Sequence, residues 1–96
     1  MLREDIRNAL ANYCDEWQLE EGERPLLLDG FDESIIGITE DFRVVYSYEK
    51  MVQEYAKDNE CSYEDAIEWI DYNTMRAIPY FGEHRPIVYH EIEAYL

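Results

Sequence analysis

Basic residues are scarce in this chain of 96 residues. Lysine and arginine together number 8, against 23 aspartate and glutamate residues, which gives a formal net charge of −15 at pH 7. A chain this acidic is repelled by the phosphates of nucleic acids and by anionic lipid headgroups. We therefore expect no direct nucleic-acid binding and no membrane association, and we expect a charged partner to be basic.

Cysteine and histidine are also sparse. Cys14 and Cys61 are far apart and lack metal-ligand spacing, so the sequence predicts no disulfide framework. His84 and His90 have no third histidine or cysteine beside them, whereas a zinc site takes three or four ligands. Neither a Walker A loop nor a G-x-G-x-x-G loop is present for phosphates. We expect no metal and no cofactor.

Long apolar runs are missing as well. No segment approaches the roughly 20 apolar residues that a membrane span needs. The first ten residues, "MLREDIRNAL", lack the apolar core of a signal peptide. With so few cysteines, a reducing compartment is the simplest expectation. We expect a cytoplasmic protein.

The apolar residues that are present predict one α+β domain over residues 1–96. An N-terminal helix is expected at Leu2–Leu19, with an apolar stripe of Leu2, Ile6, Ala9, Leu10, Tyr13 and Trp17. A short antiparallel β-sheet is expected from the apolar runs Leu26–Leu28, Ser34–Ile38 and Arg43–Tyr48. The first of these runs is equally consistent with a loop that packs into the core. Gly37, inside a strand pattern, indicates a bulge or a close approach of the backbone.

Two central helices and a final strand complete the predicted fold. Ser47 and Ser62 are suited to be N-cap residues, and Ser62-x-x-Asp65 resembles a capping box with aspartate in place of glutamate. The buried stripe of the first central helix comprises Tyr48, Met51, Val52, Tyr55 and Ala56. The next helix is expected to end near Asn73, with inward-facing Tyr63, Ala66, Ile67 and Ile70. The final strand is expected at Ile87–His90, and the last six residues extend it or form a short helix.

Catalytic patterns are weak. Paired carboxylates are common in any acidic chain and usually form a solvated surface, whereas acid–base catalysis needs a buried carboxylate with a raised pKa. Ser34, Ser47 and Ser62 suit turns and caps, and the acidic neighbours of Cys61 oppose a reactive thiolate. We predict a protein that is not an enzyme. The alternatives are a ligand-binding domain or enzyme with a pocket near Asn73, Glu83 and His84, or an oligomerisation module.

The acidic residues are unevenly distributed. Residues 29–41 and 58–71 contain several acids and no lysine or arginine. In the second stretch Glu64, Glu68 and Asp71 follow an i, i+4, i+7 path and stand roughly 5–6 Å apart along a helix axis, a spacing comparable with that of DNA phosphates. Like charges at these spacings destabilise a helix, which favours selection by a partner, although a solvated face is the alternative. The predicted partner-binding residues are Asp58, Glu60, Glu64, Asp65, Glu68 and Asp71, with Tyr72, Tyr80 and Phe81 as aromatic contacts.

Four segments resemble a family of small, mostly uncharacterised phage and prophage proteins: "DGFDESIIGI", "VVYSYEKMV", "CSYEDAIEWIDYNTMRA" and "GEHRPIV". The pattern of that family runs D-x-[AS]-[LI]-I-G, V-V-Y-[DS], S-x-E-E-A-x-E-[FWY] followed by N, and G-E-x-x-P-[IV]. The matching positions here are Ser34, Ile36, Gly37, Val44, Val45, Tyr46, Ser62, Glu64, Ala66, Glu68, Trp69, Asn73, Gly82, Glu83 and Pro86.

This resemblance implies an accessory protein that a mobile element makes inside a bacterial host, and it implies no catalytic residue. By analogy of size, charge and origin, it suggests an inhibitor of host defence of the anti-CRISPR or anti-restriction type. Such a protein would bind a basic host protein or nucleoprotein complex and occupy its nucleic-acid groove as a DNA mimic. A homo-oligomer is compatible with this function.

Overall fold

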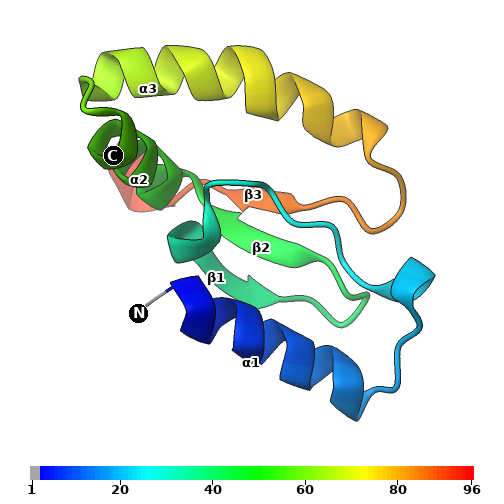
Figure 1. The fold of residues 1–96 in the computed structure, drawn as a ribbon. Coiled ribbons are helices and arrows are strands. Elements are labelled where there is room, and N and C mark those ends of the chain that lie inside the picture. The colour runs from blue at the N-terminus through cyan, green and yellow to red at the C-terminus, as the bar shows by residue number, and fades with distance from the viewer. Residues whose placement is uncertain (1–2) are drawn as a thin grey trace.

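The computed structural model describes residues 3–96, which form three α-helices and one three-stranded sheet (Figure 1). The helices are α1 (Arg3–Glu16), α2 (Tyr48–Asn59) and α3 (Tyr63–Trp69). The strands are β1 (Ile35–Ile38), β2 (Val44–Ser47) and β3 (Ile87–Tyr89). The predicted α+β fold class is confirmed, and none of the helices in residues 3–96 is both long and apolar enough to cross a membrane.

The sheet has the strand order β1-β2-β3 and is mixed. Strands β1 and β2 pair antiparallel, as predicted, and β3, for which no direction was predicted, pairs parallel to β2. The helices between β2 and β3 return the chain to the start of the sheet, and such a crossover joins parallel strands. A register irregularity between Ile35 and Gly37 confirms the bulge. The run Leu26–Leu28 is a loop and places Leu28 in the core.

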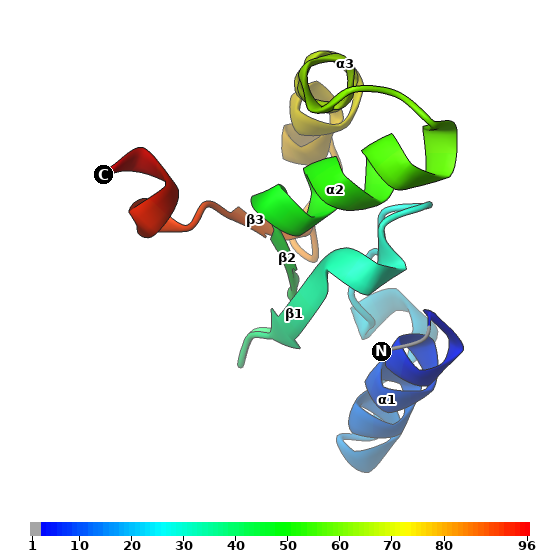
Figure 2. The same ribbon diagram turned by 90° about the vertical axis from the view of Figure 1, so that its left-hand side faces the viewer.

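One face of the sheet is covered and the other is more open. Figure 2 shows the strands nearly edge-on, with the helices on one side and the C-terminal turn on the other. On β2, Val44 and Tyr46 are fully buried beneath the helices, whereas Val45 is only half-buried. Tyr89 on β3 is exposed. This alternation is that of a sheet with a single covered face.

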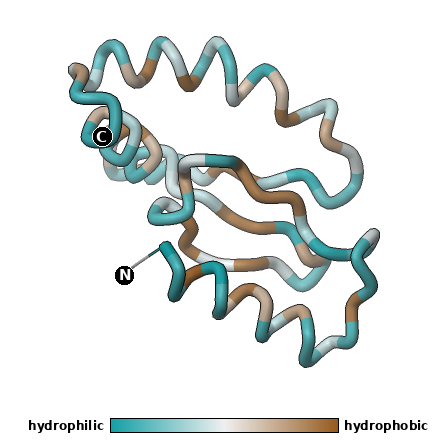
Figure 3. The backbone as a smooth tube through the Cα atoms, viewed as in Figure 1, coloured by the Kyte–Doolittle hydropathy of each residue, from teal (hydrophilic) through white to brown (hydrophobic). Residues whose placement is uncertain are grey.

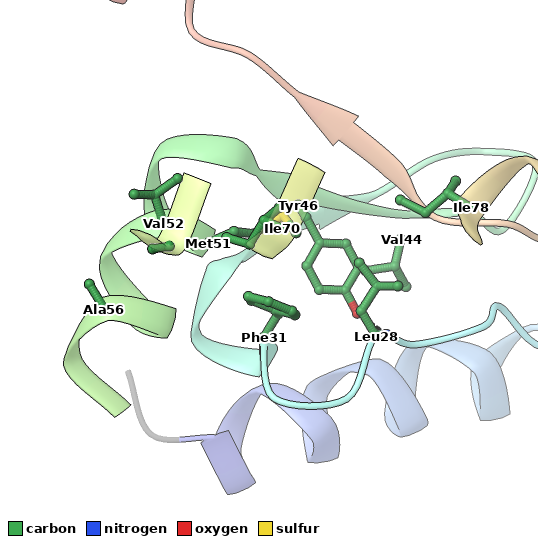
Figure 4. Packing of buried hydrophobic residues seen from close by; sticks show 10 residues of the cluster. Leu28, Phe31, Val44, Tyr46, Met51, Val52, Ala56, Ile70 and Ile78 are labelled. Carbon is green, nitrogen blue, oxygen red and sulfur yellow. Dashed lines mark hydrogen bonds between the residues drawn. The ribbon is translucent and has the colours of Figure 1, made fainter. Parts of the chain in front are cut away.

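Tyr46 lies at the centre of the core. Figure 4 shows its ring among Leu28, Phe31 and Val44. Figure 3 shows hydrophobic stretches along the strands and along the loop that runs beside them. The buried Tyr46 hydroxyl accepts a hydrogen bond from the Leu28 N–H at 2.8 Å. Burial disfavours the charged phenolate and raises the pKa of Tyr46 to about 12. This hydrogen bond connects the loop at Leu26–Leu28 to strand β2.

Helix α1 is shorter than predicted. It ends at Glu16, and Gln18 has a left-handed φ of 54°, so the chain turns away before the stripe reaches Trp17. Trp17 is 61% exposed and Ala9 is exposed, and both were predicted to lie on the buried stripe. Cys14, which was not part of the predicted stripe, is buried on the inner face of α1. Leu2 lies outside the described residues.

Two buried carboxylates connect α1 to the rest of the fold. Asp32, in the 3₁₀ turn Asp32–Ser34, accepts a hydrogen bond from Arg7 Nη2 at 3.2 Å. Glu54 of α2 is only 5% exposed and accepts a hydrogen bond from the Ser34 hydroxyl at 2.7 Å. Arg3 Nη2 lies 3.2 Å from the other Glu54 oxygen. These partners satisfy the carboxylates that burial would otherwise penalise.

The N-termini of α2 and α3 are capped as predicted. The Ser47 hydroxyl accepts the Lys50 N–H at 3.3 Å, and the Ser62 hydroxyl accepts the Asp65 N–H at 3.1 Å. Both serine side chains thus satisfy backbone donors that have no partner within the helix. Glu60 ends α2 in the left-handed region, with φ 50° and ψ 46°.

The end of α3 differs from the prediction. Its α-geometry stops at Trp69 and continues as a π-helical turn, Ile70–Met75, which runs past the expected end at Asn73. Ala66 and Ile70 are fully buried, as expected, whereas Tyr63 and Ile67 are exposed and were wrongly assigned to the core. The chain continues through a 3₁₀ turn, Ile78–Tyr80, to β3, and it ends in another 3₁₀ turn, Ile92–Tyr95, rather than in an extended strand.

Candidate functional site

Helices α2 and α3 cross steeply above the sheet. In Figure 1 α3 runs across the view while α2 is seen nearly end-on, and Figure 2 reverses the two. Only the short connection after Asn59 separates them in the chain. The crossing buries Ala66 and Ile70 against α2 and leaves most of the outer surface of α3 in solvent. This surface holds most of the predicted partner-binding residues.

Four carboxylates of the α3 segment are exposed. They belong to Glu64, Asp65, Glu68 and Asp71. Within residues 3–96, the ion pairs join other acids to arginine, and none involves these four side chains. Asp32 and Glu54, by contrast, are buried and form ion pairs with arginine. The α3 segment therefore presents carboxylates that no neighbouring side chain neutralises in the part of the chain that is described.

Asp71 departs from the predicted path of acids. The Tyr48 hydroxyl donates a hydrogen bond to Asp71 Oδ1 at 2.7 Å. Burial of the Tyr48 ring, together with this bond and the negative charge of Asp71, raises the pKa of Tyr48 well above its usual value. Asp71 lies in the π-helical turn, which changes the angular step between side chains, so it is turned towards α2. The regular one-turn spacing applies to Glu64 and Glu68.

The exposed surface of α3 is not uniformly acidic. A shallow hollow of about 420 Å³ brings apolar and basic groups among the acids, and it is lined by Glu64, Ile67, Glu68, Asp71, Tyr72 and Arg76. The Arg76 guanidinium carbon lies 4.4 Å from the centre of the Tyr72 ring, which is a cation–π contact. We use the name α3 face for the surface formed by Glu64, Asp65, Ile67, Glu68, Asp71 and Tyr72.

Two predicted acids lie apart from the α3 face. Asp58 forms an ion pair with Arg3 and so takes part in the attachment of α1 to α2. Glu60 is exposed in the connection between α2 and α3, where its backbone ends α2. No described contact joins either of them to the acids of α3. The structure thus places three of the six predicted acids on α3 and a fourth, Asp71, in the π-helical turn that continues it.

The predicted aromatic contacts are all exposed but do not form one cluster. Tyr72 is 65% exposed and belongs to the α3 face. Phe81 lines a separate hollow of about 220 Å³ together with Trp69 and Asn73. Tyr80 projects into solvent.

Trp69 is a surface aromatic that the sequence prediction missed as a binding residue. It is 41% exposed and stacks on the Tyr55 ring, with 4.7 Å between the ring centres. Its position in the sequence could have indicated this role, because residues four apart on a helix share a face and Trp69 lies four residues after Asp65. It also follows Glu68 directly. Tryptophan is among the residues that are enriched at protein interfaces.

None of the hollows described in this section is lined by Asn73, Glu83 and His84 together. The Asn73 side chain donates to the Trp69 carbonyl at 2.9 Å, while Glu83 is exposed on the loop before β3. His84 is half-buried, and its Nδ1 has no hydrogen-bond partner within residues 3–96. In the same part of the chain, no three His, Cys, Asp or Glu side chains are grouped so that they could hold a metal ion.

Comparison of the chain with protein families, curated proteins and solved structures finds no match.

Proposed function

We propose that this protein binds a basic surface of another protein through the α3 face. The observation that supports the proposal is the exposure of four carboxylates on one helical segment, without ion pairs in the described chain, beside exposed Ile67, Trp69 and Tyr72. Aromatic residues with a charged surround are typical of protein interfaces. Apolar contact would provide affinity, and the carboxylates would provide attraction and orientation.

The proposed partner is the nucleic-acid groove of a host defence or DNA-processing complex. Glu64 and Glu68 lie one helical turn apart, so their carboxylates are separated along the axis by roughly 6 Å, on the scale of successive phosphates. A groove that attracts DNA would attract this face, since the whole chain carries a net charge of −15. The motif resemblance to phage proteins supports a bacterial cytoplasm as the setting and inhibition of the complex as the outcome. No catalytic step is proposed.

A charge-reversal experiment tests this function. The test variant is Glu64→Lys with Glu68→Lys, and the matched control is Glu16→Lys with Glu40→Lys. Both control residues are exposed and make no side-chain hydrogen bond or ion pair within residues 3–96. Because each variant replaces two glutamates with two lysines, the two variants change the net charge equally. Each protein is used as bait in a lysate of the bacterial host, and captured proteins are challenged with duplex DNA.

We expect the wild type and the control to capture the same nucleic-acid-binding complex, which DNA displaces. We expect the test variant to lose it because its binding face is reversed. Equal capture by the test variant and the control would contradict the proposal, because charge reversal on the α3 face would then affect binding no more than charge reversal elsewhere on the protein.

Self-association is a second candidate function, favoured by the open face of the sheet. Ile36 and Tyr89 are exposed there, and Val45 and Ile87 are half-buried. Exposed apolar surface of this kind commonly marks an interface. Light scattering on the purified protein tests it: a dimer that Tyr89→Arg converts to a monomer would support an oligomerisation module, and a monomer at all concentrations would exclude it.

A further inference from the structure

We propose that the hollow between α2 and α3 receives an arginine side chain of the partner. The hollow has a volume of about 560 Å³, which lies within the roughly 300–1,000 Å³ usual for binding sites, and it is lined by Tyr55, Asn59, Cys61, Asp65, Glu68, Trp69 and Tyr72. The inference rests on the proposed function, which it deepens by naming the group that the protein recognises.

The aromatic side of the hollow is rigidly supported from the core. The ring centres of Phe31 and Tyr55 lie 6.5 Å apart, with an angle of 20° between the ring planes. Tyr55 in turn stacks on Trp69 at 4.7 Å and 22°. Phe31 is buried, so this column of rings extends from the core to the surface. A binding surface held in this way loses little conformational freedom when a planar group stacks on it.

Two carboxylates complete the site. Asp65 and Glu68 line the same hollow as Trp69 and Tyr72, and within residues 3–96 no arginine or lysine forms an ion pair with either acid. A cation above an aromatic ring is attracted by the electrons of the ring, and carboxylates beside it supply hydrogen-bond acceptors. Rings and acids in one hollow are therefore complementary to a cation and unfavourable for a phosphate.

Arginine suits this hollow better than lysine. Its guanidinium is planar, stacks on aromatic rings and is more weakly hydrated than an ammonium group, and its donors match carboxylates in pairs. The chain itself already contains such a contact, since Arg76 lies over the Tyr72 ring at 4.4 Å. The site thus distinguishes arginine from other cations, whereas net charge alone does not.

The two tryptophans allow a test on the unmodified protein. Trp69 lines the hollow, and Trp17 lies on the C-terminal side of α1, 61% exposed and packed against Phe42. Their indole N–H groups give separate signals in a ¹⁵N-correlated NMR spectrum. Titration with an octa-arginine peptide at about 0.15 M salt, where charges more than ~8 Å apart are screened, should shift the Trp69 signal and leave the Trp17 signal in place. A shift of Trp17 alone would overturn the inference.

Peptide chemistry provides the second arm. Octa-arginine, octa-lysine and octa-citrulline are compared, the last of which keeps the shape of arginine without its charge. We expect octa-arginine to bind roughly two- to fivefold more tightly than octa-lysine, from the size of an exposed cation–π contact, and octa-citrulline not to bind. Equal affinities for arginine and lysine peptides would overturn the inference.

Variants localise this preference. Trp69→Leu and Tyr72→Leu should each reduce the ratio of arginine to lysine affinity towards one, while the control Trp17→Leu should preserve it. Tyr72 is 65% exposed, so its variant remains informative if Trp69→Leu does not fold. A ratio that survives in both hollow variants would place arginine recognition elsewhere.

The peptide series also separates this inference from the proposed function. If both cationic peptides bind equally and Glu64→Lys with Glu68→Lys abolishes both, the acidic face is supported and the arginine hollow is refuted. If the Glu16→Lys, Glu40→Lys control weakens both peptides as much as the face variant does, the proposed face itself fails.

Discussion

Replacing Glu54 with leucine should destabilise the fold strongly, because three separate segments meet at this carboxylate. Glu54 is 5% exposed and lies on α2. It accepts the Ser34 hydroxyl at 2.7 Å and the Glu33 N–H at 3.3 Å, and Arg3 of α1 lies 3.2 Å away. Leucine preserves the apolar stem and volume but accepts no hydrogen bond, so the variant isolates the polar contacts.

The magnitude follows from what remains unpaired. Ser34 is fully buried, and a buried donor without a partner costs about 1–3 kcal/mol. The half-buried Glu33 N–H adds less, and half-exposed Arg3 adds little because water screens it. We expect a loss of about 2–4 kcal/mol, which corresponds to roughly 10–25 °C in the melting temperature of a domain this size. Glu54→Gln retains an acceptor for Ser34 and should cost about 1 kcal/mol.

Urea denaturation of a double-mutant cycle measures the contact directly. Glu54→Leu, Ser34→Ala and the combined variant are compared, with Gln53→Leu as a control at an exposed position of the same helix. Removing the Ser34 hydroxyl also removes the unpaired donor, so the combined variant should be more stable than the sum of the single losses predicts by about 1–2 kcal/mol. Additive losses, or a Glu54→Leu cost no greater than that of Gln53→Leu, would refute the account of this buried carboxylate.

Three further predictions concern stability. Tyr46→Phe leaves the Leu28 N–H without its acceptor and should cost about 1–3 kcal/mol in urea denaturation at neutral pH. Because burial raises the pKa of Tyr46 from 10.0 to about 12, its contribution is complete below pH 10 and is lost as the pH rises to about 12; the phenylalanine variant should therefore show a weaker loss of stability across this window, and an unchanged alkaline profile would contradict the assignment. Ser62→Ala removes the cap of α3 and should cost about 1 kcal/mol in thermal denaturation. An unchanged melting temperature would contradict this value. Glu60→Gly relieves a left-handed backbone and should raise stability by about 1 kcal/mol; a lower melting temperature would show that the Glu60 side chain makes a stabilising contact.

Local sequence patterns predicted local structure well. The caps at Ser47 and Ser62 and the bulge beside Gly37 depend on residues a few positions apart, and the structure confirms them. The buried side of α2 was also predictable, since Val52 and Ala56 are four residues apart and face the core together with Met51.

Contacts between distant residues were not predictable in the same way. The direction of β3 depends on how the preceding helices cross the sheet. The burial of Glu54 depends on Ser34, 20 residues earlier, and on Arg3, 51 residues earlier. An isolated sequence pattern assigns a glutamate to the surface by default, because it does not contain the partners that permit its burial.

The α3 face depends both on local sequence patterns and on contacts between distant residues. The exposed acids Glu64 and Glu68 follow from helical spacing, whereas exposure of Ile67 does not, because a regular period assigns it to the buried stripe. The steep crossing of α2 covers only part of that stripe. The π-helical turn after Trp69 then changes the direction in which the Asp71 side chain points, and no residue type in the turn predicts this change.

Photo-crosslinking inside bacterial cells tests the central claim most directly. A benzophenone amino acid replaces Tyr72 on the α3 face or, as a control, Trp17 on α1; the two side chains are similarly exposed, at 65% and 61%. We predict that the Tyr72 position crosslinks to a basic nucleic-acid-binding protein, that Glu64→Lys with Glu68→Lys removes this product, and that the Trp17 position does not form it. The same product from both positions, or its survival after charge reversal, would contradict binding through the α3 face.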